Sequence, residues 1–216
     1  MVALPLDYCI DSTEVTQGQY QTWLDTKPST SGQISACSGN TSFAPSKNWT
    51  PASSPNYPVV GVDWCDAYAY CFGVGKRLCG KIGGGSNDTG DFANSSKSQW
   101  YAACTSNGAY TSTGYPYGST HKATYCNGPD ANMGATVAVG TMLQCQSTVS
   151  GYAGVYDLSG NVFEWEDSCV GMSGSPNGCH VRGGAFDQGG DYLQCGGDYN
   201  WAGVWAFGDV GFRCCS

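Results

Sequence analysis

The stretch RGGAFDQGGDYLQCGGDYNWAGVWAFGDVGFR, from Arg182 to Arg213, decides how the fold and the function are interpreted. Its two ends have the character of framework strands, and no Lys or Arg lies between the terminal arginines. Its middle interleaves aspartates and aromatic residues among glycines. Aromatic side chains beside short polar ones offer rigid, amphipathic contact area, which is typical of a recognition surface. The alternative is a glycine-rich core loop, because large aromatic side chains are usually well buried.

The composition favours one large, loop-rich domain. A chain of 216 residues predicts a single domain over 1–216 that is long enough to bury a substantial core. Only 12% of the residues are charged, and 32 glycines and 9 prolines predict many turns and long irregular segments. The net charge of −8 argues against binding to nucleic acid or anionic lipid. No apolar run reaches the length of about 18 residues that a membrane span needs, so we expect no membrane insertion.

The 13 cysteines predict several disulfides and an oxidising compartment, which is extracellular, cell-surface or periplasmic. The odd number leaves at least one cysteine unpaired or paired between chains. The N-terminus has no charged region followed by a long apolar one, so an exported protein would have lost its signal. Zinc is a poor alternative, because the chain has no CxxC pair and only two histidines, His121 and His180.

Three segments carry signals for helices. Helices are predicted over Thr16–Thr26, where Tyr20, Trp23 and Leu24 share one face, over Asp63–Phe72 and over Ser98–Cys104. Thr, Asp and Ser at their starts can cap the first turn, and the second helix has a capping-box-like pair of aspartates. The segment Lys27–Pro58 is predicted to be a long loop, and turns and short strands follow from Gly108 onward.

Eight short motifs together resemble the formylglycine-generating enzyme family, which is also called the sulfatase-modifying-factor family. They occur in the family's order and cover nearly the whole chain: EVTQGQY at 14–20, YPVVGVDWCDAYAYC at 57–71, GKRL at 75–78, QWYAAC at 99–104, YPYG at 115–118, VYDLSGNVFEWEDS at 155–168, RGGAF at 182–186 and GFRC at 211–214. The resemblance implies an α+β, C-type-lectin-like fold with a small twisted antiparallel sheet, two main helices and extensive irregular loops.

The resemblance also implies two disulfides, Cys71 with Cys214 and Cys104 with Cys195, which would lock helices to the C-terminal strands. Proximity in the sequence suggests two further pairs, Cys126 with Cys145 and Cys169 with Cys179. The partners of the remaining cysteines stay open, namely Cys9, Cys37, Cys65, Cys79 and Cys215.

A structural calcium site is a further implication of the resemblance. The family's calcium loop corresponds to Asp157, Gly160, Val162 and Glu164, which offer two carboxylates and two main-chain carbonyls. Such hard oxygen ligands suit Ca²⁺ better than a transition metal. The alternative is a hairpin turn with solvated acids. A second calcium site of the family would begin at Asn127 and Gly128, but its other ligands are not recognisable.

The family's catalytic residues are not matched. Family members oxidise a substrate cysteine with O₂ and a copper(I) ion, which two cysteines hold after a GGSY-type motif. Here the motif is GGAF, with Ala185 in place of the serine, and Cys195 is the first thiol after it. We therefore expect no copper and no enzyme activity. The alternative is a divergent copper oxidoreductase that pairs Cys195 with Cys79 or Cys215.

Other catalytic arrangements also fail in this sequence. The chain has too few histidines for a three-histidine iron site and lacks the EPN and WND motifs of sugar-binding lectins of this fold. Glu164 and Glu166 alternate along a predicted strand, and we expect them on opposite faces, where they could not serve as an acid and base pair.

The variable proteins of diversity-generating retroelements share this scaffold and also resemble the sequence. They display a C-terminal segment, bounded by RGG and GFR-like framework, in which adenine-templated codons are randomised. Randomised asparagine codons yield Asp, Tyr, Gly, Ala, Val, Phe or Asn, and many of these occur between Asp187 and Asp209. Such codons cannot yield Trp or Gln, so four residues would be fixed or differently templated, namely Gln188, Gln194, Trp201 and Trp205.

The predicted function is therefore a non-catalytic, ligand-binding domain, with a protein or other macromolecule as its partner. We expect a monomer, and a structural accessory domain of an exported assembly is a further alternative. The predicted binding residues are Asp187, Asp191, Tyr192, Asp198, Tyr199, Asn200, Trp201, Val204, Trp205 and Phe207.

Overall fold

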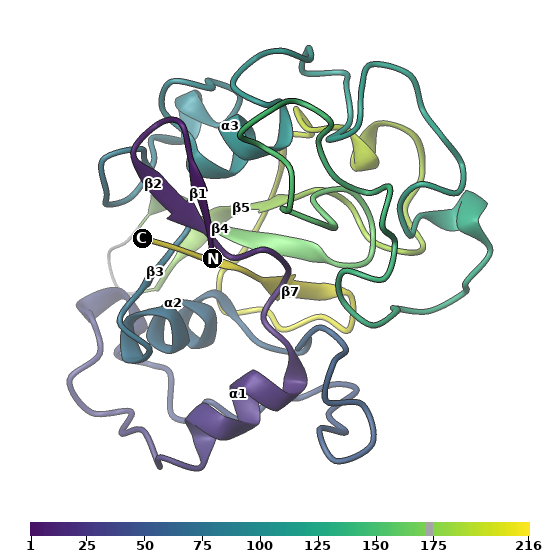
Figure 1. Cartoon of the computed structure of the whole chain (residues 1–216). Helices are drawn as coiled ribbons and strands as arrows, with labels where there is room; N and C mark the ends of the chain where they lie inside the picture. Colours follow the sequence, from purple (N-terminus) through teal and green to yellow (C-terminus); the bar gives the residue numbers. More distant parts are fainter. Residues whose placement is uncertain (172–174) are drawn as a thin grey trace.

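The computed structural model describes residues 1–171 and 175–216. Its helices are α1 (Gln17–Leu24), α2 (Trp64–Gly73) and α3 (Gln99–Cys104), with 3-10 turns η1 (Ser35–Cys37), η2 (Thr89–Asp91), η3 (Pro129–Ala131) and η4 (Gly190–Leu193). Its strands are β1 (Val2–Leu4), β2 (Tyr8–Ile10), β3 (Arg77–Leu78), β4 (Phe163–Gly171), β5 (Asn177–Arg182), β6 (Tyr199–Trp201), β7 (Val210–Phe212) and β8 (Cys214–Cys215). In Figure 1, α1 and α2 lie below the central strands and α3 lies above them.

Each helix begins at the cap that the sequence predicts. The Thr16 hydroxyl accepts the Gln19 N–H at 3.2 Å, and α1 ends two residues earlier than predicted. Asp63 and Asp66 form a reciprocal capping box at the start of α2. The hydroxyl of Ser98 caps α3. These caps satisfy N–H groups that have no partner within the helix, so the local sequence sets the helix starts.

The strands form two four-stranded sheets. The first has the order β1-β2-β8-β3 and joins the two ends of the chain, since Cys9 and Ser216 exchange main-chain hydrogen bonds of 3.2 and 2.9 Å. The second has the order β6-β5-β4-β7, and its β4 and β7 run parallel. The expected α+β, C-type-lectin-like fold class is confirmed, with two sheets and one parallel pair in place of a single antiparallel sheet.

Two hydrophobic clusters form the core. The larger one packs α1 and α2 on the second sheet around Tyr20, Trp64, Trp165 and Phe212. The smaller one packs α3 against the N-terminal hairpin around Trp100. Aromatic side chains therefore supply much of the buried apolar area, which is the largest favourable contribution to folding.

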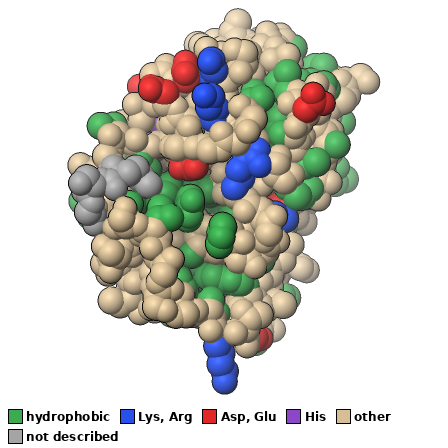
Figure 2. Space-filling view, turned by 90° about the vertical axis from the view of Figure 1, so that its left-hand side faces the viewer, with side chains coloured by type: hydrophobic (Ala, Val, Ile, Leu, Met, Phe, Trp, Pro, Cys, Tyr) green, Lys and Arg blue, Asp and Glu red, His purple; other side chains and the backbone are tan. Residues whose placement is uncertain are grey.

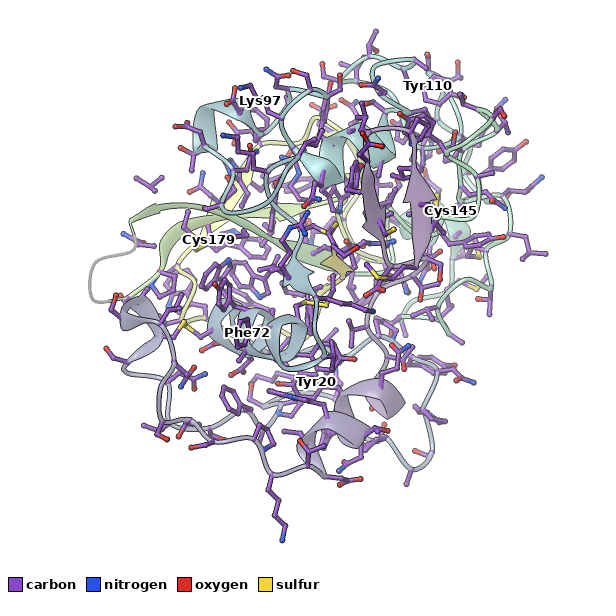
Figure 3. The ribbon with its side chains drawn as sticks, turned by 60° about the vertical axis from the view of Figure 1, so that its left-hand side comes forward. Tyr20, Phe72, Lys97, Tyr110, Cys145 and Cys179 are labelled. Carbon is purple, nitrogen blue, oxygen red and sulfur yellow. A yellow bond between two sulfur atoms is a disulfide. The ribbon has the colours of Figure 1, made fainter. Side chains whose placement is uncertain are left out.

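Six disulfides crosslink this loop-rich fold (Figure 3). The four pairs expected from the sequence are among them, and the other two are Cys37–Cys65 and Cys79–Cys215. Cys9 is the cysteine without a disulfide partner in the described part of the chain. So many disulfides are typical of an extracellular or periplasmic protein.

The surface carries few charged side chains, as the face in Figure 2 shows. Over residues 1–171 and 175–216, no helix has the length and apolar character that crossing a membrane requires.

Candidate functional site

The stretch from Arg182 to Arg213 leaves the second sheet at the end of β5 and returns through β7, and both terminal arginines are fully buried. Arg182 donates to the carbonyl oxygen of Cys195 at 2.9 Å and lies over the ring of Trp100 at 4.9 Å. Arg213 lies against Glu164 with two hydrogen bonds of 2.6 and 2.7 Å. The two ends are therefore framework.

Three points between these ends hold the segment to the core. At Gly184, with φ of +71°, a Cβ atom would lie 2.8 Å from the carbonyl oxygen of Tyr192. Cys195 is bonded to Cys104 of α3. At Gly203 a Cβ atom would lie 2.6 Å from Pro176, and the Gly203 carbonyl accepts the Trp64 N–H. The residues between these three points lie nearer the surface, and the contacts at the three points hold their backbone in place.

The displayed aromatic side chains form one continuous series of ring contacts around Phe163. Tyr192 stacks on Tyr199 with 4.3 Å between ring centroids. Trp201 contacts Phe163 and Phe207 at 5.0 Å each, and Phe207 contacts Trp205 at 5.7 Å. We call Tyr192, Tyr199, Trp201, Trp205 and Phe207 the aromatic face.

The aromatic face is partly exposed. Trp205 is 53% exposed and Tyr192 is 37% exposed, whereas Tyr199, Trp201 and Phe207 are half-buried. The alternative of a core loop with packed aromatics holds in part for Tyr199, Trp201 and Phe207, which pack against the larger core cluster. It fails for Tyr192 and Trp205, whose rings are exposed. A partly exposed aromatic series on a rigid base has the properties of a binding surface, because its rings lose little entropy on contact.

The polar residues predicted with the aromatic face are divided between two sides. Tyr199 and Trp201 point to one side of β6, so Asn200 between them points to the other. Asp198 also turns away, toward His180 behind the sheet, at 3.1 Å between carboxylate and ring nitrogen. The expected single surface therefore holds the aromatic residues together but does not include Asn200 and Asp198.

The other predicted residues lie at the edges of the aromatic face. Asp187 and Asp191 are exposed, and Asp191 accepts a hydrogen bond from Gln194 at 2.9 Å. Val204 is 52% exposed and lies next to Trp205. Burial raises the pKa of Asp209, and the nearby carboxylate of Asp187 raises it further. The aromatic face thus has an acidic border.

Ser168, His180 and Asp198 form a hydrogen-bonded line that contains the residue types of a hydrolytic triad. The Ser168 hydroxyl lies 3.0 Å from Nδ1 of His180, whose Nε2 faces Asp198. Burial lowers the pKa of His180, and the positive charge of Arg182 adds to this effect, so the neutral ring is favoured. Ser168 is fully buried while Asp198 is exposed, so this serine cannot reach a substrate. These hydrogen bonds therefore hold the start of β6 against β5 and β4, and they do not form a hydrolytic site.

The cysteines considered for copper are all in disulfides. Cys195 is bonded to Cys104, and Cys79 is bonded to Cys215. The position of the family's active-site serine, Ala185, is fully buried. A copper(I) site of two thiolates would require the reduction of one of these disulfides, because only the thiolate binds the metal.

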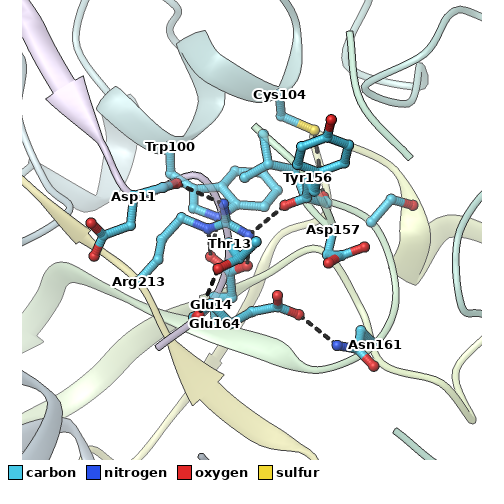
Figure 4. Close-up of polar contacts among 12 residues, drawn as sticks. Asp11, Thr13, Glu14, Trp100, Cys104, Tyr156, Asp157, Asn161, Glu164 and Arg213 are labelled. Carbon is cyan, nitrogen blue, oxygen red and sulfur yellow. Dashed lines mark hydrogen bonds and ion pairs between the residues drawn. The ribbon is translucent and has the colours of Figure 1, made fainter. Parts of the chain in front are cut away.

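The acids of the expected calcium loop are Asp157 and Glu164 (Figure 4). Both are buried, so the alternative of a hairpin turn with solvated acids is wrong. In the motif VYDLSGNVFEWEDS, the strand β4 begins at Phe163, and the residues before Ser159 form no strand. Asp157, Gly160 and Asn161 all have positive φ, at 61°, 74° and 64°, which folds the loop tightly before β4. A Cβ atom at Gly160 would lie 2.3 Å from the Asn127 carbonyl oxygen, so glycine is required there.

The carboxylate of Glu164 is fully engaged by protein donors. Arg213 donates to both of its oxygens, and Trp100 donates to Oε2 at 2.9 Å. Arg213 also donates to the carbonyl oxygens of Asp11 and Tyr156 at 3.1 and 2.8 Å. Glu164 therefore differs from the expected calcium ligand, since both of its oxygens already accept hydrogen bonds from the protein.

Three other buried oxygens near this ion pair have no donor among the described residues, namely Oε2 of Glu14, Oδ1 of Asp157 and Oδ1 of Asn127. Asn161 connects two of these side chains, since it donates to Glu14 at 2.9 Å and accepts from Asn127 at 3.1 Å. Burial raises the pKa of Glu14, and the nearby Asp157 raises it further. Buried acceptors without donors are costly, and either a cation or a proton shared between Glu14 and Asp157 would compensate them. Among the described residues, no group of three or more His, Cys, Asp or Glu side chains is placed to hold a metal ion.

The expectation for Glu164 and Glu166 is wrong. Residues two apart on a strand share one face, and both carboxylates face α3, where Ser98 donates to Glu166 at 2.6 Å and Trp100 donates to Glu164. Both side chains are almost fully buried, and Arg182 and Arg213 lie against them. They act as core ion pairs.

Two residues of the site were given no role by the sequence. Phe163 is the base on which the aromatic face packs, and its position in the strand-like run VFEWE could have indicated this. Glu14 lies within the EVTQGQY motif, but its distance of 143 residues in sequence from Asp157 conceals their contact. Only the closed fold brings the two carboxyls together.

Comparisons with known proteins agree with this architecture. The mouse formylglycine-generating enzyme is 29% identical over 134 residues, which cover 55% of this chain and 31% of the mouse protein. Treponema denticola variable protein 1 has a TM-score of 0.57 at 20% identity and covers 96% of this chain and 84% of its own. PvdO from Pseudomonas aeruginosa has a TM-score of 0.62 at 19% identity, with 96% and 79% coverage.

The chain thus spans about a third of the mouse enzyme, and the two structures share its fold. The sequence pattern of the sulfatase-modifying factor enzyme 1-like domain matches residues 2–216. This chain is therefore a member of the sulfatase-modifying factor enzyme 1-like domain family, as its eight motifs predicted.

Proposed function

We propose that this protein is a non-catalytic binding protein, exported to an oxidising compartment, whose partner docks on the aromatic face. The observation that carries the proposal is the continuous, partly exposed series of rings from Tyr192 to Trp205, mounted on framework that is anchored at both ends. A broad surface of this kind suits a protein or other macromolecule better than a small molecule. We propose that it acts as a monomer.

The cysteine chemistry supports a binding role. The family's copper-binding thiols have no counterpart after GGAF, and Cys195 has a structural role in its bond to Cys104. The copper alternative is tested by titrating the reduced protein with copper(I). Tight binding of one equivalent, together with oxidation of a cysteine-containing peptide, would favour an oxidoreductase instead.

We further propose that the segment between Phe186 and Asp209 is diversified. The fold likeness to Treponema denticola variable protein 1 supports this proposal. The segment also contains many residues that randomised asparagine codons can yield, namely Asp, Tyr, Gly, Ala, Val and Phe. The test is the neighbouring DNA. A near-copy of the coding segment that differs only at adenines, beside a reverse transcriptase gene, is the expected finding, and its absence would remove the diversification while leaving the binding role.

We propose structural Ca²⁺ near the loop before β4. Asp157 would hold the ion through its unpartnered Oδ1, together with the carbonyls of Gly160 and Val162. Glu14 would replace Glu164 as the second carboxylate, because its Oε2 is free of donors and Glu164 is paired with Arg213. The ion would neutralise two buried negative charges and fix the loop.

Alanine at the two exposed ends of the aromatic face tests the binding role. The Tyr192→Ala/Trp205→Ala variant should fold normally, because these are the two most exposed rings of the aromatic face and neither belongs to the buried core clusters. The control is Leu143→Ala, at a residue that is 69% exposed outside the segment. Each protein is immobilised in its oxidised form and exposed to secreted and surface proteins of the source organism. Retained partners are purified and their affinity is measured by calorimetry.

We expect a partner that binds wild type and the Leu143→Ala control equally. The double variant should bind this partner at least about 30-fold more weakly, because it loses two aromatic contacts worth about 1 kcal/mol or more each. A partner that binds the double variant within twofold of wild type would place the binding site elsewhere. If no partner is retained at all, the proposed binding role fails.

A further inference from the structure

A cavity of about 300 Å³ lies between α1, α2 and the loop that follows α1. None of its lining residues belongs to the Arg182–Arg213 segment. Its walls include the aromatic side chains of Trp23, Phe43, Tyr68 and Phe72. This volume is at the lower end of the range for small-molecule sites, which are typically concave and mainly apolar.

The lining contains no charged side chain. In Figure 2 the hydrophobic side chains on this side of the molecule gather around and below the centre of the face, among mainly uncharged atoms. An ion placed there would lose its hydration without gaining a partner, so the cavity favours an uncharged ligand.

Trp23 provides a hydrogen-bond donor in the wall of the cavity. The three fully buried tryptophans, Trp64, Trp100 and Trp165, each donate their indole N–H, at 2.9, 2.9 and 3.1 Å. Trp23 is only 6% exposed, yet its Nε1 has no acceptor in residues 1–171 and 175–216 and is not sealed from solvent. The N–H group of a buried indole usually has a hydrogen-bond partner. The described residues supply none to Trp23, so a ligand could accept this hydrogen bond.

Gly73 keeps this donor approachable. It lines the cavity at the end of α2, and a Cβ atom there would lie 2.5 Å from Nε1 of Trp23. The neighbouring Phe72 is 76% exposed and provides an apolar rim (Figure 3). A ligand that covers this ring would remove apolar surface from water, which favours binding.

The loop that closes the cavity is held in place before any ligand arrives. The Cys37–Cys65 disulfide joins it to α2, and Tyr20 donates to the Phe43 carbonyl at 2.8 Å. The Gln33 amide donates to the carbonyl oxygens of Thr30 and Asn40 at 2.9 Å each. A preformed wall reduces the entropy that binding costs.

We propose that this cavity is a second binding site, for a neutral, flat and mainly apolar small molecule that carries one hydrogen-bond acceptor. The rings of Phe43, Tyr68 and Phe72 contact its body, and the acceptor receives the Trp23 N–H. The cavity shares no lining residue with the aromatic face.

The test compares 1-indanone with indane, which have the same bicyclic skeleton but differ by one carbonyl. Each is titrated into ¹⁵N-labelled, fully oxidised protein, and the indole signal of Trp23 is identified by its absence in Trp23→Phe. We expect 1-indanone to shift this signal saturably with a Kd of about 1 mM or lower. It should bind about 2- to 10-fold more tightly than indane, and Trp23→Phe should abolish this preference.

Two variants locate the binding. Phe72→Ala should fold normally and weaken both ligands, whereas Gly73→Ala should remove the preference for the carbonyl because its Cβ covers the donor. The control is Gly39→Ala, where a Cβ would meet nothing within 4 Å. No saturable shift, equal affinities for the two ligands, or equally tight binding of the anion phenylacetate would overturn the proposal. A wild type that sediments as a dimer while Phe72→Ala is monomeric would also overturn it, in favour of self-association.

Discussion

Replacement of Arg213 by methionine should destabilise this protein more than any loss of a surface charge. Arg213 is fully buried and makes two hydrogen bonds to Glu164 and one each to the carbonyls of Asp11 and Tyr156. Its removal leaves the Glu164 carboxylate buried with Trp100 as its remaining donor. Breaking a buried pair in this way costs about 3–5 kcal/mol, a large part of a total stability of about 5–15 kcal/mol.

The same reasoning predicts a partial rescue. In Glu164→Gln/Arg213→Met the buried negative charge is gone, and the glutamine oxygen can still accept from Trp100. The double variant should recover about 2 kcal/mol relative to Arg213→Met alone. The control is Lys76→Met, which breaks the partly exposed pair with Asp11 and should cost at most about 1 kcal/mol.

Urea unfolding of the oxidised proteins, followed by circular dichroism and tryptophan fluorescence, measures these differences. Coincident transitions by both probes justify a two-state free energy. If Arg213→Met costs no more than Lys76→Met, the buried pair is not a major element of this core. If the double variant is as unstable as the single one, the uncompensated carboxylate is not the cause.

Two further predictions concern ionisation and calcium. Burial raises the pKa of Asp167 to about 6, so the stability that its protonated carboxyl contributes is complete below about pH 4 and is lost as pH rises through 6. Asp167→Asn does not titrate, so its stability relative to wild type should increase by about 3 kcal/mol between pH 4 and 8, and a constant difference would contradict this. Calcium at 100 times its Kd should stabilise wild type by about 2.7 kcal/mol after treatment with a chelator. In thermal unfolding, Glu14→Gln should lose this shift and the exposed control Asp25→Asn should keep it; an unchanged shift in Glu14→Gln would exclude Glu14 as a ligand.

The sequence predicts local structure well in this protein. The starts of all three helices follow from their caps at Thr16, Asp63 and Ser98, because capping depends on residues within one turn. The aromatic residues among the glycines and aspartates of Arg182–Arg213 likewise predict a partly exposed aromatic surface.

What the sequence does not reveal depends on long-range contacts. The parallel pairing of β4 with β7 and the Cys37–Cys65 and Cys79–Cys215 disulfides join segments that no local pattern connects. The split of Asp198 and Asn200 from the aromatic rings follows from the register of β6 on β5. A shift of one residue in that register would exchange the two faces.

The fold class also does not determine function in this family. Members of this family include enzymes, whereas in this chain the GGAF motif holds a buried Ala185, and Cys195, the next cysteine after the motif, is bonded to Cys104. Function therefore has to be argued from the residues of the site rather than from the fold.

The adjacent cysteines of β8 have a consequence for the order of folding. Cys214 lies in the larger hydrophobic cluster and bonds to Cys71, whereas Cys215 lies in the smaller cluster and bonds to Cys79. During synthesis neither bond can form until residues 214 and 215 have left the ribosome, so Cys71 and Cys79 lack their native partners and can form other disulfides first. The exchanged pairing, Cys71 with Cys215 and Cys79 with Cys214, needs a shift of only one residue along the chain. Correct oxidation therefore has to follow the docking of β8 between β2 and β3. Maturation of this protein should depend on disulfide isomerisation more than on the speed of oxidation.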